Sequence, residues 1–141
     1  MSRSWARVAS IALAVMVSSC SSATEPQSGG VDFARVLWLG SHPRTYSYEV
    51  AVTAFFGTPG SVRVQVSDGR VVSARDSTGQ TVANFDLTVD DIWDDLLAAR
   101  ARNELNSAKF GQRGVPVEVD LGTWANDGGV HYSVRNFALT R

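Results

Sequence analysis

Cysteine is almost absent from this chain of 141 residues, which contains only Cys20. A single thiol forms no intramolecular disulfide, so packing has to stabilise the fold even in an oxidising compartment. Histidine is also scarce: His42 and His131 lie far apart in the sequence, and there is no HExxH motif. Because zinc needs three or four ligands, these residues do not indicate a zinc site or a catalytic pair, and no cofactor is expected.

Basic clusters and long apolar runs are missing as well. The chain has 13 basic and 14 acidic side chains without a basic stripe, so nucleic acid is not an expected partner. The uncharged run at residues 8–17 is shorter than the roughly 20 residues of a membrane-spanning helix. The chain also lacks a GxSxG elbow, a Walker loop and a dinucleotide fingerprint. The sequence thus favours a protein that is not an enzyme.

The N-terminal segment is typical of a secretory signal. Arg3 and Arg7 precede the apolar run, and small residues follow it. The segment ends in Val17, Ser18, Ser19 and Cys20, which resemble the bacterial lipobox.

That resemblance implies that the Cys20 thiol takes a diacylglyceryl group and that a signal peptidase removes residues 1–19. The expected location is then the cell membrane, through the lipid and outside the cytoplasm. A buried cysteine and a plain secretory signal cut elsewhere are the alternatives.

After the signal, the sequence predicts two parts. Residues 20–30 comprise the acylated cysteine and a polar stretch rich in serine and glycine, typical of a flexible tether. Residues 31–141 are enough for one small domain with one hydrophobic core.

The hydrophobic pattern of residues 31–141 predicts the elements of that domain. In 32–39, Phe33, Val36, Leu37 and Trp38 fall at helical spacing, which predicts a short helix. The predicted strands are residues 45–52, 62–66, 71–74, 109–110, 115–121 and 132–139, and Asp68-Gly69 predicts a hairpin turn. Pro116 lacks a backbone donor, which favours an edge strand or the first residues of a strand. In the last strand the pair Tyr132 and Val134 is out of phase with Phe137 and Leu139, so a bulge is expected near Arg135 or Asn136.

The segment 87–103 is predicted to form an amphipathic helix packed on the sheet. Thr88 is its expected cap, with Asp91 three residues later as a weaker form of the capping box. The expected class is α+β, a single domain with a mainly antiparallel sheet.

A family resemblance rests on several of these motifs taken together: Trp38, Tyr46-Ser-Tyr48, VRVQVSDGRVVSARD, VDDIWDDLL and GVPVEVD. Their order is similar to that in a bacterial lipoprotein family known as domain of unknown function 6174. Many members carry cysteines at the end of the first strand, where this chain has Phe55 and Phe56. The resemblance implies the fold and the anchor, and it implies no activity.

Four carboxylates and one loop are the candidate sites of the domain. Asp90, Asp91, Asp94 and Asp95 supply the oxygen ligands that calcium or magnesium prefers, but a rigid helix spreads them over more than one direction. The alternative is that the first two stabilise the helix by interacting with the positive end of its dipole, and that the other two make its solvent-exposed side polar.

Trp124 lies between Gly122 and a turn at residues 126–129, where a loop would expose it. The hypothesis is a contact loop that includes Trp124, Asn126 and Asp127.

Three functions are compatible with this pattern. The leading interpretation is a lipid-anchored protein of the cell envelope whose small, non-catalytic domain binds an envelope protein or another envelope component. The alternative is a sensor module for a small ligand or a divalent metal. An uncharacterised enzyme is the third.

Overall fold

The computed structural model describes residues 28–54, 60–123 and 128–140. Its elements in chain order are α1 (Ser28–Ser41), β1 (Tyr46–Ala54), β2 (Val62–Ser67), β3 (Arg70–Arg75), α2 (Val89–Ala101), β4 (Leu105–Phe110), the short 3₁₀ helix η1 (Gln112–Gly114), β5 (Pro116–Leu121) and β6 (Val130–Leu139). No helix in these ranges is long and apolar enough to cross a membrane.

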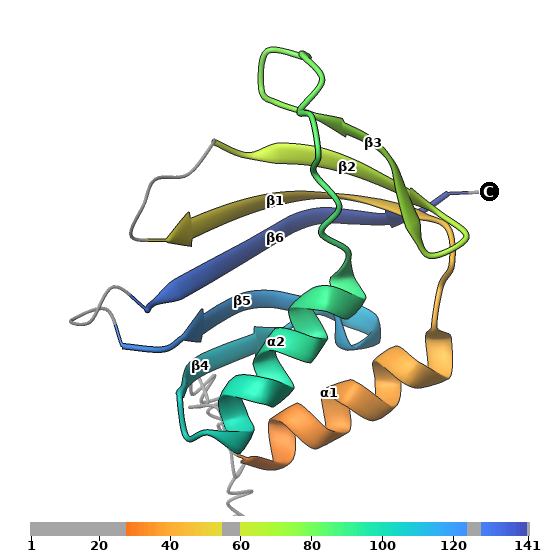
Figure 1. The fold of residues 1–141 in the computed structure, drawn as a ribbon. Coiled ribbons are helices and arrows are strands. Elements are labelled where there is room, and N and C mark those ends of the chain that lie inside the picture. The colour runs from red at the N-terminus through yellow and green to blue at the C-terminus, as the bar shows by residue number, and fades with distance from the viewer. Residues whose placement is uncertain (1–27, 55–59, 124–127, 141) are drawn as a thin grey trace, which may run out of the picture.

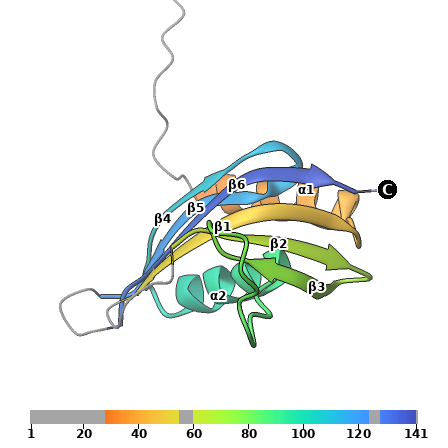
Figure 2. The ribbon, with the colours of Figure 1, turned by 90° about the horizontal axis from the view of Figure 1, so that it is seen from above.

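The strands form one six-stranded antiparallel sheet in the order β3-β2-β1-β6-β5-β4. The helix α2 lies against one face of this curved sheet (Figures 1 and 2). The helix α1 packs on η1 and contacts α2 through side-chain hydrogen bonds. Asp68 (φ 51°) and Gly69 (φ 74°) form the tight turn between β2 and β3. The predicted α+β class, the single antiparallel sheet and the packing of α2 are therefore confirmed.

The helix α2 begins as the sequence predicts. Thr88 accepts a hydrogen bond from the Asp91 backbone, and the Asp91 carboxylate accepts one from the Thr88 backbone N–H, which completes a capping box. At the far end, Arg100 donates two hydrogen bonds to Asp32 at 2.6 and 3.1 Å. These bonds hold the pKa of the Asp32 carboxyl below its usual value and join the end of α2 to the start of α1.

The helix α1 is longer than predicted and buries a different side. It begins at Ser28 rather than at 32, within the stretch expected to be a tether. Its buried residues are Val31, Ala34 and Trp38, and the Trp38 indole donates a 2.8 Å hydrogen bond to Asp90. Of the four residues whose spacing predicts the helix, only Trp38 is buried. Phe33, Val36 and Leu37 are exposed.

All three tyrosines of the chain are buried on the inner face of the sheet. The Tyr46 hydroxyl accepts a hydrogen bond from the first backbone N–H of α2. The Tyr48 hydroxyl donates to the carbonyl oxygen of Leu87, and the Tyr132 hydroxyl donates to Asp95 at 2.5 Å. These hydroxyls therefore join strands β1 and β6 to the start and the outer side of α2.

These tyrosines predict that the protein loses stability in alkali. Burial is the main cause that raises the pKa of Tyr46 to about 12, and it also raises the pKa of Tyr48 and Tyr132. Because each tyrosine pKa is higher in the folded state than in the unfolded state, the tyrosines stabilise the fold fully below about pH 10, the pKa of an unfolded tyrosine. This stabilisation is lost as the pH rises through the pKa of the folded state. We expect the melting temperature to fall above about pH 10, and tyrosinate absorbance to appear together with unfolding. Tyrosinate formed near pH 10 in protein that is still folded would contradict this.

Candidate binding cleft between β5 and β6

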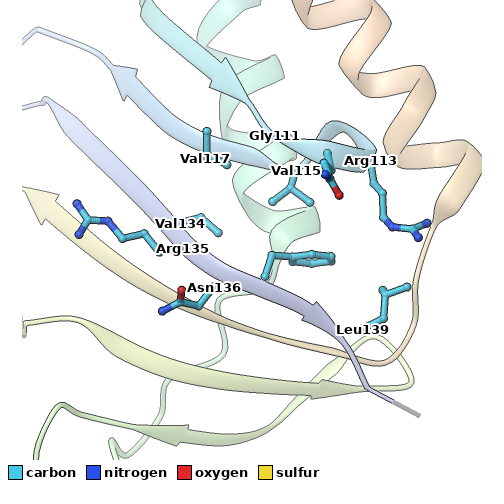
Figure 3. A pocket seen from close by; sticks show the side chains of 10 residues that line it. Gly111, Arg113, Val115, Val117, Val134, Arg135, Asn136 and Leu139 are labelled. Carbon is cyan, nitrogen blue, oxygen red and sulfur yellow. The ribbon is translucent and has the colours of Figure 1, made fainter.

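The sheet opens between two of its central strands. Pairing of β5 with β6 runs from Leu121 and Val130 to Glu118 and Ser133, and stops there. Beyond this point β6 remains paired with β1 as far as Leu139, whereas β5 begins beside β4 and η1. The gap is a cavity of about 290 Å³, which we call the β5–β6 cleft (Figure 3).

The cleft has apolar walls and a polar rim. Its apolar lining comprises Val115, Val117, Val134, Phe137 and Leu139, and its rim comprises Gly111, Gln112, Arg113, Arg135 and Asn136. The Phe137 ring packs on the core, with ring centroids 5.2 Å from Tyr46 and 6.1 Å from Trp38. The cleft therefore opens directly onto the core.

The wall at η1 depends on a close backbone approach. Arg113 and Gly114 both have positive φ angles, 62° and 73°. A Cβ atom at Gly114 would lie 1.9 Å from the carbonyl oxygen of Ala34 and 2.9 Å from the Trp38 backbone nitrogen. Only glycine fits here, so the η1 wall of the cleft is packed directly on α1.

On the opposite wall, a β-bulge changes the direction of β6. The pairing of β1 with β6 shifts between Ser47 and Glu49, and Asn136 has a φ of 52°. This confirms the bulge expected near Arg135 or Asn136. Because the bulge interrupts the alternation of β6, Phe137 can turn its ring towards the core while its neighbours remain exposed.

The rim carries positive charge from two arginines. Within the described ranges Arg113 is exposed and forms no ion pair. Arg135 lies near Glu49, whose pKa is lowered chiefly by a hydrogen bond from Arg63, next by one from Asn136, and to a smaller degree by the charge of Arg135. Arg113 is therefore the rim cation best placed to pair with an anionic group of a ligand.

The four carboxylates of α2 do not converge. Asp90 accepts the Trp38 hydrogen bond, Asp91 caps the helix, and Asp95 accepts a hydrogen bond from Tyr132. Asp94 is exposed. In the part of the chain that the structure describes, no three or more His, Cys, Asp or Glu side chains are grouped so as to hold a metal ion.

The two histidines belong to different parts of the molecule. His42 follows α1, and its Nε2 lies 3.8 Å from an Asp90 oxygen. His131 lies on β6 and lines a second cavity, of about 270 Å³, together with Glu118 and Arg135.

The remaining predicted site residues lie outside the described residues. These are the lipobox residues Val17, Ser18, Ser19 and Cys20 and the contact loop with Trp124, Asn126 and Asp127. The cleft itself was not predicted from the sequence. Two local signals pointed to its edges: Pro116, which lacks a backbone donor and starts β5, and the out-of-phase apolar pairs of β6.

Comparison of the chain with known proteins identifies a family but no individual relative. No curated protein and no solved structure matches this chain. One family model matches residues 30–139. This range includes α1 apart from its first residues, the whole of α2, all six strands and both walls of the cleft. The chain belongs to a family of unknown function (DUF6174).

Proposed function

We propose that this protein is a lipid-anchored component of the bacterial cell envelope, and that its domain binds an extended segment of an envelope protein in the β5–β6 cleft. Support for the anchor comes from the lipobox resemblance of Val17, Ser18, Ser19 and Cys20 after a basic and apolar leader. Support for binding comes from the cleft.

The observation that carries the binding proposal is the free edge of β6. Residues 134–139 have β1 on one side and, within the described ranges, no strand on the other. Backbone N–H and C=O groups of a strand point alternately to its two edges, so some of them face the cleft. Uncovered strand edges readily accept another chain, and extended peptides bind many domains by adding a strand in this way.

The shape of the cleft favours a strand over an enclosed small molecule. Its volume of about 290 Å³ is near the lower limit of the roughly 300–1,000 Å³ typical of small-ligand pockets. By contrast, six residues of strand edge offer about 20 Å of backbone to a partner. Val117 and Phe137 would contact alternate side chains of the partner, and Arg113 would pair with an acidic one.

Peptide selection followed by amide hydrogen exchange tests this proposal. Peptides would be selected from a random library on the full-length protein. We expect them to have apolar residues at alternate positions with a nearby acid, and to slow amide exchange at residues 134–139. Leu139→Asp should weaken binding by about tenfold or more, because it puts a charge on the apolar lining.

Val72→Asp is the matched control. Val72 and Leu139 are both exposed apolar residues, at 63% and 48%, and Val72 lies on β3, away from the cleft. The control should bind the peptides like the unmodified protein. The proposal would be contradicted if the selection yielded no such peptides or if the selected peptides slowed amide exchange at other residues. Equal binding to the Leu139→Asp variant would contradict it as well.

A further inference from the structure

The helix α1 presents a largely apolar surface to solvent. Six large apolar side chains are exposed in the described ranges, and four of them belong to α1: Phe33 (66%), Val36 (66%), Leu37 (40%) and Leu39 (54%). At 100° per residue these four fall within an arc of about 160°. We call them the outer face of α1. Figure 1 shows α1 at the margin of the domain, with only one side against the other elements.

The two charged residues of α1 both interact with the domain, although the Asp32 side chain remains 67% exposed and lies near Leu39 at one border of the outer face. Asp32 pairs with Arg100. The Arg35 guanidinium lies over the Trp93 ring, 5.2 Å from its centroid. A helix that is apolar on both sides is normally covered on both sides, and the domain covers only the side of Val31, Ala34 and Trp38.

The length of chain before α1 indicates what lies against this face. Eight peptide units separate Cys20 from Ser28, where α1 begins. Fully extended they span at most about 28 Å, somewhat more than the length of α1 itself, about 21 Å for its 14 residues. An acyl group on Cys20 would therefore keep the first turn of α1 within about 28 Å of the lipid headgroups, so the whole of α1 can reach the membrane surface.

We propose that α1 lies along the membrane surface with its outer face at the boundary between headgroups and acyl chains. This inference rests on the proposed anchor at Cys20. The outer face is the side of a single helix, and such faces bury their apolar side chains in the interface plane. Because Gly114 is packed on the backbone of α1, this docking also fixes the η1 wall of the β5–β6 cleft relative to the membrane.

Nitroxide accessibility tests the docking. The full acylated chain would carry Val36→Cys, whose thiol is the only free one because the lipid occupies Cys20. In vesicles of phosphatidylcholine and phosphatidylglycerol, a nitroxide at 36 should collide more with oxygen and less with an aqueous nickel chelate, by severalfold compared with a nitroxide at Val72→Cys. Val72 is the matched control, since it is exposed to a similar degree and lies on β3. Adding Phe33→Ser and Leu37→Ser should return the nitroxide at 36 to the aqueous phase.

The outcomes separate this inference from the anchor. Intact mass of the same preparation reports whether Cys20 is acylated, and a chain without the acyl group contradicts the proposed anchor. An acylated chain whose nitroxide at 36 is as accessible to the nickel chelate as that at 72 overturns the docking alone. Dipolar broadening between nitroxides at 36 would show a second copy against the outer face, and would also overturn it.

Discussion

Gly114→Ala is expected to lower the free energy of unfolding by about 3–5 kcal/mol. Two costs combine at this position. The φ of 73° is unfavourable for any residue with a Cβ atom. The new Cβ would also lie 1.9 Å from the Ala34 carbonyl oxygen, a backbone atom of α1 that can move only if the helix moves. Urea unfolding of the full-length protein measures the loss.

Gly69→Ala separates the two costs. Gly69 has a φ of 74°, almost equal to that of Gly114, but a Cβ atom at Gly69 would have no other atom within 4 Å. Its replacement should cost only the backbone strain, about 1–2 kcal/mol. Equal losses for the two variants would show that α1 is not packed on η1 as described.

Cys20→Ala is expected to move the protein from the membrane fraction to the soluble fraction almost completely. Buried hydrocarbon contributes about 0.8 kcal/mol per CH₂, and two or three acyl chains anchor stably where one binds only reversibly. The outer face of α1 alone has four apolar side chains, so washed membranes should release the variant. Fractionation followed by quantitative detection of the protein measures this.

Ser19→Ala is the control for this variant. It keeps a small residue before the cysteine and leaves the thiol in place. This variant should remain with the membrane. If Cys20→Ala also stayed on washed membranes, attachment would not depend on the thiol.

Local patterns in the sequence predicted most of the fold. Strict alternation from 45 to 52 places Tyr46, Tyr48 and Val50 on one face, and these three are buried on β1. The Thr88 cap is equally local, because the residues that form it are three positions apart. Such features depend on neighbouring residues, which the sequence places directly.

The buried side of α1 could not be predicted in the same way. Phe33, Val36 and Leu37 have a helical spacing as regular as that of Val31, Ala34 and Trp38. The choice between the two sides depends on distant contacts, which are the Trp38 hydrogen bond to Asp90 and the approach of Gly114 to the α1 backbone. A periodic pattern predicts the helix but not which of its sides is buried.

The cleft follows the same rule. Pro116 and the phase change of β6 marked the starting end of β5 and the bulge. The gap itself arises because β5 keeps its pairing with β4 as far as Pro116 while β6 keeps its pairing with β1 as far as Leu139. The register of β6 on β1 joins strands that are distant in the sequence, so a local pattern does not reveal where it diverges from the neighbouring β4–β5 pair.

The most direct test of the account is the intact mass of the native product purified from membranes. We predict a chain that begins at Cys20 and carries a diacylglyceryl group on its sulfur. A product that retains residues 1–19 with an unmodified Cys20 would contradict the anchor, and with it the docking of α1 at the membrane.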